Sequence, residues 1–294
     1  MKQYLDLLDY ILTNGEEKDD RTGIGTLSVF ARQLKFNLQE GFPAVTTKKL
    51  AWKAVVGELL WFIEGSGNER RLAEITHGTS DGTVTIWTPN AQASYWKHKA
   101  KFEGDLGRVY GVQWRHWQST NTKWVTENGI SYKRNVEIDQ LANLIEGLKR
   151  DPNGRRHILN VWNAGELDDM ALPPCHILCQ FYVNKNRELS CHMYQRSVDV
   201  FLGLPFNIAS YALFTHLIAQ VSNLGVGELI ISTGDTHIYK DHMLQVREQL
   251  ERVPLELSQL KLNPDVTDID GFTMNDIYLE GYYSHGPIRA SMAV

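Results

Sequence analysis

The segment that most constrains the fold is a predicted helix with no polar side. From Leu50 to Glu64, apolar residues extend nearly all the way round the helix, so we expect it to be buried. Thr46 and Thr47 lie just before it and can cap its first turn. Glu58 lies inside the helix, and burying a carboxylate is costly unless it is paired or protonated. Glu58 is therefore either a functional acid with a raised pKa or a structural side chain bonded to the backbone.

The rest of the pattern predicts long helices and mostly antiparallel strands. A helix from Tyr4 to Leu12 ends at Gly15, and a long apolar helix runs over 205–224. The alternation that starts at Leu27 shifts phase before Leu34, which predicts a strand with a bulge. Further strands are predicted at 155–163, after the turn DPNG, and at 176–183, 188–195 and 228–232, with a helix at 243–250. We expect an α+β fold, a single domain over residues 1–294 with a large mixed, mostly antiparallel sheet packed by long helices.

Composition narrows the class of protein. The 294 residues carry a formal net charge of -5, which disfavours a general nucleic-acid binder because such binding relies on a basic surface. No apolar run approaches the roughly 20 residues needed to cross a bilayer, and the N-terminus is amphipathic and acidic rather than a signal peptide. Three cysteines without a secretory signal favour reduced thiols. We therefore expect a cytoplasmic protein that requires neither a membrane nor a nucleic acid.

Cys175 stands at the start of an apolar strand, in the segment LPPCH at 172–176. A free cysteine of this kind is often a small buried hydrophobe. A metal site with Cys179, Cys191 and His192 is disfavoured, because Cys191 and His192 are successive strand residues and point to opposite faces. The third interpretation is a nucleophile, which needs nearby positive charge to form the thiolate.

Three arginines offer such charge. Arg196 follows the strand that we expect to pair with the strand of Cys175, and Arg155 and Arg156 begin another neighbouring strand. Paired arginines at a strand start are also common on solvated surfaces. The residues alone therefore leave both packing and catalysis open for Cys175.

Ten ordered segments give the chain a wider resemblance. They are DRTGIGT (20–26), FPAVTTKK (42–49), ELLWFIEG (58–65), VTIW (84–87), VYGVQWR (109–115), GRR (154–156), LPPCH (172–176), YQRSVDVFLGLPFNIASYA (194–212), GDTHIY (234–239) and the closing MAV. The block at 194–212 is the longest and the most specific. Through these segments the chain resembles the thymidylate synthase family along nearly its whole length.

The resemblance implies a methyltransferase that converts dUMP to dTMP. The family uses 5,10-methylenetetrahydrofolate as one-carbon donor and hydride source, uses no metal, and works as an obligate homodimer. A face of the sheet would form the dimer interface, and Arg155 and Arg156 would reach across it to the partner's substrate phosphate. Dimerisation would then complete each active site.

The resemblance also assigns roles to individual residues. Cys175 would add to C6 of the uracil ring, Asn207 would recognise the base, and the terminal carboxylate of Val294 would close a lid over the folate. The implied catalytic set is Cys175, Glu58, Tyr110, His176, Asn207, Asp199 and Arg196. The implied dUMP-binding set is Arg21, Arg155, Arg156, Arg196, Ser197, Asp199, Asn207, His237 and Tyr239. The implied folate-binding set is Lys48, Ile86, Trp87, Asp199, Leu202, Gly203, Phe206, Ala293 and Val294.

The sequence departs from the family pattern in three places. After VTIW it reads Thr88-Pro89-Asn90 where Asp-Glu-Trp is common, and the missing tryptophan weakens one expected wall of the folate pocket. The segments 73–82 and 119–135 look like insertions in variable surface loops. The strand after Arg156 reads NVWN where Ser-Ala-Trp-Asn is usual, a small change in packing.

Two alternatives to the methyltransferase follow from these residues. A dUMP hydroxymethylase of the same family would trap the methylene intermediate with water instead of hydride, although Trp87 and the apolar terminal residue favour the hydride route. A non-catalytic nucleotide- or RNA-binding homologue is disfavoured by Cys175, Glu58 and Asn207, and by the acidic balance of the chain.

Overall fold

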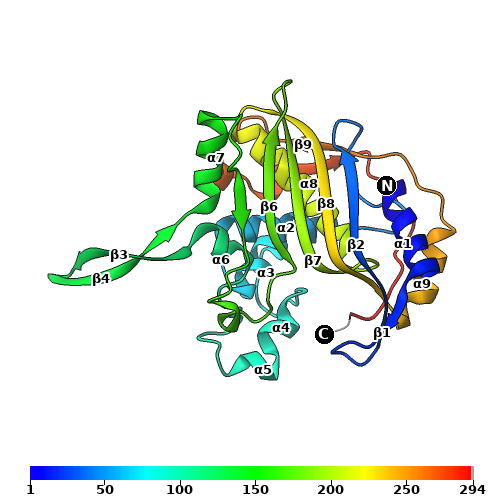
Figure 1. Ribbon diagram of the computed structural model, residues 1–294, viewed down its shortest axis with the longest axis horizontal. Coiled ribbons are helices and arrows are strands. Elements are labelled where there is room, and N and C mark those ends of the chain that lie inside the picture. Colours follow the sequence, from blue (N-terminus) through cyan, green and yellow to red (C-terminus); the bar gives the residue numbers. More distant parts are fainter. Residues whose placement is uncertain (293–294) are drawn as a thin grey trace.

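A six-stranded mixed sheet forms the centre of the protein in the computed structural model, which describes residues 1–292 (Figure 1). The strand order is β1-β2-β8-β7-β6-β5, in which β7 and β8 are parallel and the other neighbours are antiparallel. The strands are β1 (Glu16–Lys18), β2 (Thr26–Asn37), β5 (Ile158–Asn160), β6 (His176–Val183), β7 (Glu188–Asp199) and β8 (Gly225–Tyr239). The expected α+β fold with a mostly antiparallel sheet is confirmed.

Helices cover one face of this sheet, some of them in direct contact with its strands and others packed on neighbouring helices (Figure 1). They are α1 (Lys2–Asn14), α2 (Trp52–Glu64), α3 (Glu69–His77), α4 (Thr88–Gln92), α5 (Ser94–Lys97), α6 (Tyr110–Arg115), α7 (Gln140–Arg150), α8 (Leu204–Val221) and α9 (Met243–Leu250). Figure 1 shows α2 and α8 behind the sheet, where their apolar side chains are almost all buried. A small hairpin, β9 (Gln259–Leu262) and β10 (Ile277–Glu280), lies apart from the main sheet. No helix within residues 1–292 is long and apolar enough to span a membrane.

The predicted cap of α2 is wrong. The helix begins at Trp52 after Ala51, and no side chain caps it. Thr46 and Thr47 are buried and bind other segments instead, because the Thr46 hydroxyl accepts a hydrogen bond from the Leu255 N–H at 3.0 Å. These two threonines therefore tie the strand-to-helix connection to the C-terminal third of the chain rather than start the helix.

The apolar alternation in β2 shifts by one residue as predicted, but the cause is not the expected bulge. Pairing of β2 with β8 keeps one register throughout and omits Ala31 together with Gly234. Ala31 has φ of 59°, in the left-handed region. Val29 is buried before this kink and Leu34 after it, so the buried positions change from odd to even numbers. Both strands thus bend at the same level of the sheet.

Strand lengths also differ from the prediction. The strand expected at 228–232 extends over the whole of β8, the strand expected at 188–195 continues to Asp199, and β5 is shorter than the predicted 155–163. β8 continues through Gly234, Asp235 and Thr236. Glycine and aspartate are typical of turns, so the predicted strand ended before them. The extended ends of β7 and β8 carry several of the residues singled out above.

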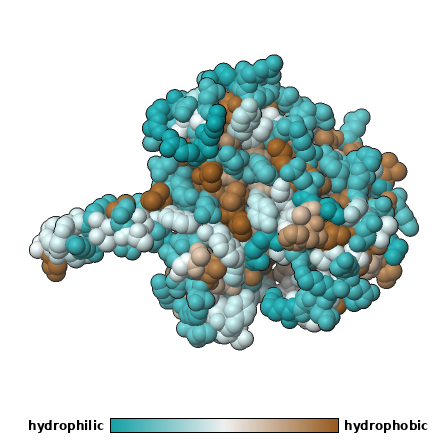
Figure 2. Space-filling view, in the orientation of Figure 1, coloured by the Kyte–Doolittle hydropathy of each residue, from teal (hydrophilic) through white to brown (hydrophobic). Residues whose placement is uncertain are grey.

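The two predicted surface-loop insertions differ in structure, because 73–82 is divided between a helix end and a loop while 119–135 is mostly strand. The first contributes the end of α3, and the second forms a hairpin arm, β3 (Trp117–Glu127) with β4 (Ile130–Ile138), that projects from the body of the protein (Figures 1 and 2). Asn128 and Gly129 connect the two strands with φ of 52° and 78°. An Asn-Gly pair with two positive φ angles is the preferred two-residue hairpin turn. The loop prediction overlooked this signal.

The face of the sheet opposite α2 and α8 is uncovered within residues 1–292. Alternate side chains on it are solvent-exposed, with Tyr182 64 % and Ile158 47 % exposed. Figure 2, in the same orientation as Figure 1, shows hydrophobic patches among polar residues on this side of the protein. Such an apolar surface on a long sheet is unusual for a face that stays in contact with water.

The contact between α2 and α6 predicts a sharp loss of stability for Gly111→Ala. A Cβ at Gly111 would lie 2.4 Å from the carbonyl oxygen of Phe62 and 2.7 Å from its Cα, so backbone must move. Overpacking of this kind costs about 1–3 kcal/mol, which we expect as the fall in unfolding free energy by urea titration. Gly286→Ala is the matched control, because a Cβ there meets nothing within 4 Å. Equal stability of the two variants would contradict the packing described.

Candidate active site

A cavity of about 850 Å³ opens between α2, the start of α8 and the ends of β7 and β8. Its walls also include the loop before β2 and the segment before α4. Of the residues predicted for the site, it is lined by Arg21, Glu58, Ile86, Trp87, Tyr110, Cys175, His176, Arg196, Ser197, Asp199, Leu202, Gly203, Phe206, Asn207, His237 and Tyr239. Residues that are distant in the sequence therefore share one enclosed space.

Cys175 is held at the start of β6 by contacts with two neighbouring segments. Its backbone N–H donates to the Tyr110 hydroxyl at 2.7 Å, and its carbonyl accepts from the Arg196 N–H at 2.9 Å. The Arg196 side chain donates to the carbonyls of Pro174 at 2.9 Å and Pro173 at 3.0 Å, and its Nη2 lies 3.9 Å from Cys175 Sγ. The two prolines thus present carbonyl groups that aim the guanidinium at the thiol.

The charge at this thiol is set mainly by burial. Burial raises the pKa of the Cys175 thiol above its ordinary value, and the nearby Arg196 guanidinium lowers it by a smaller amount. The thiol is therefore protonated at neutral pH in the isolated chain. Cys179 and Cys191 are free and fully buried, so Cys175 is the accessible thiol.

Glu58 lies on α2, is partly buried, and bonds to a side chain. Its Oε1 accepts a hydrogen bond from Trp87 Nε1 at 2.7 Å. Burial raises the pKa of Glu58, while the indole N–H lowers it by less. Of the two roles considered for this residue, the structural bond to backbone is not the one found among the described residues.

Two further titratable residues lie beside Glu58 in the cavity. Burial lowers the pKa of His176 to about 4, so its imidazole is neutral at physiological pH. The His176 and Tyr110 rings pack with their centroids 5.2 Å apart. Tyr110 has φ of 26° and a pKa raised well above its ordinary value by burial. A non-glycine residue with such a φ stores backbone strain, which commonly occurs at functional sites.

Gln195, Asn207 and Asp199 supply amide and carboxylate groups to the cavity wall. Gln195 Nε2 donates to Asn207 Oδ1 at 2.9 Å and to the Ser197 carbonyl at 3.2 Å. Asp199 Oδ1 accepts from the N–H groups of Phe201 at 2.9 Å and Leu202 at 3.0 Å. These hydrogen bonds fix the side chains of Asn207 and Asp199 where β7 ends and α8 begins.

The opposite side of the cavity is formed by β8 and the loop that carries Arg21. His237 Nδ1 lies 2.9 Å from Asp235 Oδ1, which favours a proton on Nδ1 and leaves Nε2 free to accept. Asp20 accepts from the N–H groups of Thr22 at 2.9 Å and Gly25 at 2.7 Å. The Asp20 carboxylate thereby shapes the loop that places Arg21 in the cavity wall.

Three predicted site residues lie apart from the others in residues 1–292, and two lie outside the described residues. Arg155 and Arg156 are exposed next to β5, and within residues 1–292 they are not part of the cavity wall. Lys48 is buried, donates to the Phe201 carbonyl, and its Nζ lies 3.6 Å from the centroid of the Phe201 ring. Burial lowers the pKa of Lys48 to about 7. Ala293 and Val294 lie outside the described residues, although Met292 lines the cavity.

The sequence interpretation missed three residues that support this site. Asp20, Gln195 and Asp235 all line the cavity and bond to predicted site residues or their loop. Asp235 was accessible from the sequence, because it lies two positions before His237 and alternate strand residues share a face. Gln195 carried no such signal, because its role depends on where α8 places Asn207.

The fold and the cavity bring together a thiol, an acid and an amide, which are groups that covalent catalysis on a substrate can use. No group of His, Cys, Asp or Glu side chains in residues 1–292 is arranged to hold a metal ion. The sequence model of the family described as Thymidylate synthase matches residues 2–294, essentially the whole chain. The chain belongs to this family, and so to the transferases of nucleotide metabolism and dTMP biosynthesis.

The charge balance at Cys175 predicts how its alkylation depends on pH. With iodoacetamide and mass spectrometry of the peptide, we expect the rate at Cys175 to reach half its maximum above about pH 8.5, the ordinary thiol pKa. Arg196→Met removes the nearby cation and should slow alkylation at pH 8 several-fold, whereas Arg150→Met, on an exposed residue, should not. A rate that is already maximal at pH 7 would show that positive charge beyond that of Arg196 acts on the thiol.

Proposed function

We propose that the protein converts dUMP to dTMP with 5,10-methylenetetrahydrofolate. Family membership supports this general class of reaction. The observation that carries the proposal is the Cys175 thiol 3.9 Å from the Arg196 guanidinium, in a cavity that Glu58 and Asn207 also line. A nucleophile, an acid and a group that recognises the base then act on the same ring.

Cys175 starts the reaction as a nucleophile. It loses its proton and forms a bond from sulfur to C6 of uracil, and the electron pair of the C5=C6 bond moves toward C5 and O4. When bound, the folate co-substrate supplies the one-carbon unit and then a hydride. After C5 has accepted the carbon unit, loss of the C5 proton supplies the electron pair that breaks the bond from this carbon to the folate nitrogen and leaves a methylene group on C5. Addition of the hydride to this methylene then expels the Cys175 sulfur and restores the C5=C6 bond.

The residues around Cys175 are suited to the proton transfers. Because burial raises the pKa of Glu58, its carboxyl group exchanges a proton closer to neutral pH and can serve O4 of the ring. His176 stays neutral, as its pKa of about 4 requires, and supports the same group by hydrogen bonding. The raised pKa of Tyr110 keeps its hydroxyl protonated, so it orients the C5 proton acceptor rather than acting as a tyrosinate.

Asn207 selects uracil. Its Oδ1 accepts from Gln195 and retains a second lone pair for N3–H of the base, while its Nδ2 can donate to O4. Cytosine reverses both groups and leaves the amide with two mismatches. His237 and Tyr239 would bind the ribose 3'-hydroxyl, and Arg21, Arg196 and Ser197 the phosphate, because they line the same cavity.

A dUMP hydroxymethylase is the second candidate, and one observation favours it. Asn90 lies in the cavity wall, in the segment where the resemblance led us to expect a tryptophan. A polar side chain there admits water more readily than an indole. Trp87, which is 7 % exposed, favours the hydride route because it covers the reactive end of the cavity.

Turnover with dUMP and methylenetetrahydrofolate tests the proposal. We expect absorbance at 340 nm to rise as dihydrofolate forms, with dTMP identified by mass spectrometry. Cys175→Ala should lower turnover by about 10⁴-fold or more and leave dUMP affinity within a few-fold. Cys179→Ala, on a buried thiol of the same strand, should remain active. Hydroxymethyl-dUMP with tetrahydrofolate would establish the second candidate, and persistent turnover by Cys175→Ala would refute the nucleophile.

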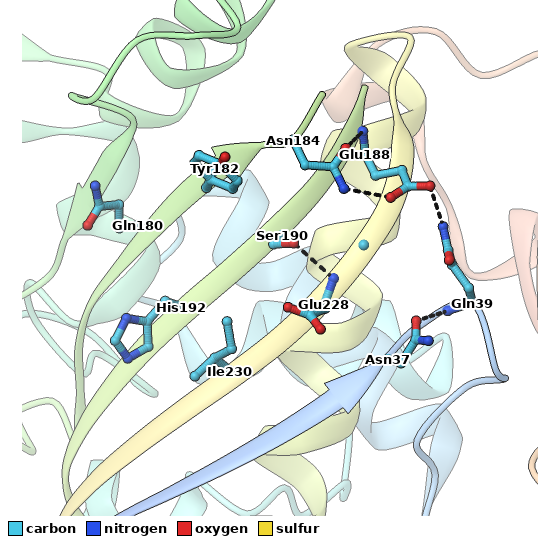
Figure 3. Close-up of a pocket in the computed structure, with 11 residues that line it drawn as sticks. Asn37, Gln39, Gln180, Tyr182, Asn184, Glu188, Ser190, His192, Glu228 and Ile230 are labelled. Atoms are coloured by element: carbon cyan, nitrogen blue, oxygen red, sulfur yellow. Dashed lines mark hydrogen bonds between the residues drawn. The ribbon is translucent and has the colours of Figure 1, made fainter. Parts of the chain in front are cut away.

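We also propose a homodimer that forms through the uncovered face of the sheet. A depression of about 570 Å³ on this face is lined by polar and apolar side chains of β6, β7 and β8, including Tyr182, His192 and Ile230 (Figure 3). A second copy would cover the exposed apolar groups. Arg155 and Arg156, which lie outside their own cavity, are then available for the partner's phosphate site and would add charge to a thiol that Arg196 alone does not ionise.

Mixing two inactive variants tests the shared site. Cys175→Ala and Arg156→Ala should each be nearly inactive alone. After unfolding and refolding together, half of the dimers are mixed and one of their two sites is intact, so about a quarter of the wild-type activity should return. Arg150→Ala, also exposed, should stay active alone. Absence of recovered activity in mixed dimers seen by native mass spectrometry would refute the exchange of Arg156.

A further inference from the structure

Trp87 is held in the cavity wall from two sides. Its indole N–H donates to Glu58, and its backbone N–H donates to the Thr85 hydroxyl at 3.2 Å. The segment around it has little packing of its own, since Val84 is 71 % and Ile86 is 55 % exposed. The indole also packs against the rings of Trp61 and Tyr110, with centroids 5.9 Å and 5.7 Å away, so hydrogen bonds and aromatic contacts together set its position.

A buried carboxylate lies behind this segment. Glu69, the first residue of α3, is 1 % exposed and its Oε1 accepts from the hydroxyls of Thr85 and Thr88, both at 2.6 Å. Arg70 balances its charge, with Nε 2.7 Å from Oε2 and Nη2 2.7 Å from Oε1. A buried charge persists only where it is paired and hydrogen-bonded in this way. The cluster lies outside the groups assigned to the reaction.

Glu69 also accounts for the departure at Thr88. The Thr88 hydroxyl donates to Glu69 and accepts from the Thr85 N–H at 2.8 Å. An aspartate in its place would be an acceptor facing a second carboxylate, and two carboxylates this close repel each other. Threonine at position 88 and glutamate at position 69 are therefore complementary.

We propose that Glu69, acting through the hydroxyls of Thr85 and Thr88, is a positioning residue that fixes Trp87 over the reactive end of the cavity and favours hydride over water in trapping the methylene intermediate. This inference rests on the proposed function. The path runs from Glu69 to the Thr85 hydroxyl, to the Trp87 backbone and through its indole to Glu58. Loss of the Glu69 acceptor frees the Thr85 hydroxyl to turn away, and the indole then no longer closes the wall where Asn90 already admits water.

Isosteric variants test this role. Glu69→Gln weakens the acceptor, and Thr85→Val and Thr88→Val remove one hydroxyl each. We expect the rate of dTMP formation to fall roughly tenfold and the hydroxymethyl-dUMP share of the product to rise, with KM for dUMP within about twofold. Thr85→Ser, which keeps the hydroxyl, should restore both values. Thr79→Val, on an exposed threonine of the preceding turn, is the matched control.

A second readout follows the indole itself. In protein labelled with 5-fluorotryptophan, the ¹⁹F resonance assigned by Trp87→Phe should shift in Glu69→Gln and Thr88→Val but not in Thr79→Val. Folded Glu69→Gln and Thr88→Val proteins with the wild-type product ratio and an unmoved resonance would overturn the inference. Formation of neither product by the wild type would instead refute the proposed function, and the resonance would still report whether Glu69 positions Trp87.

Discussion

The absence of a polar side on α2 is the constraint on which the rest of the structure depends. The helix packs against α3, α6 and α8, and this packing leaves Glu58 only partly exposed. An isolated buried carboxylate would be costly, so the surrounding groups are arranged to serve it: an indole N–H donates to it, and a cavity reaches it. The helix α2 therefore determines both how the core packs and where the acidic group of the cavity lies.

The positive charge available to the thiol is the second constraint. One guanidinium, aimed by the carbonyls of two prolines, does not offset the burial of Cys175. Arg21 lines the same cavity, whereas Arg155 and Arg156 are exposed next to β5, the edge strand of the sheet. A site that is shared between subunits would explain why a single chain supplies too little positive charge to ionise the Cys175 thiol.

The sequence predicted those features of the fold that depend on the periodicity of apolar residues and on the order of the strands. The burial of α2, the pairing of β6 with β7 and the place of Cys175 beside Arg196 follow from periodicity and strand order. Contacts between residues far apart in the sequence could not be predicted from local patterns. Thr46 and Thr47 form hydrogen bonds with the C-terminal third of the chain, and Lys48 donates to the Phe201 carbonyl. Glu69 accepts hydrogen bonds from hydroxyl groups almost 20 positions later. The arm was predictable from Asn128-Gly129, and the length of β8 was obscured by its turn-forming residues.

The kink at Ala31 and Gly234 has a consequence for how the chain can vary in length during evolution. β8 supplies Ile230 to the uncovered face and His237 to the cavity, on opposite sides of this kink. One added residue in the strand would reverse the inward and outward positions beyond it and withdraw His237 from the ligand. We therefore expect changes in length to be tolerated in the hairpin arm rather than in β8, because extra residues in the arm leave the inward and outward positions of β8 unchanged.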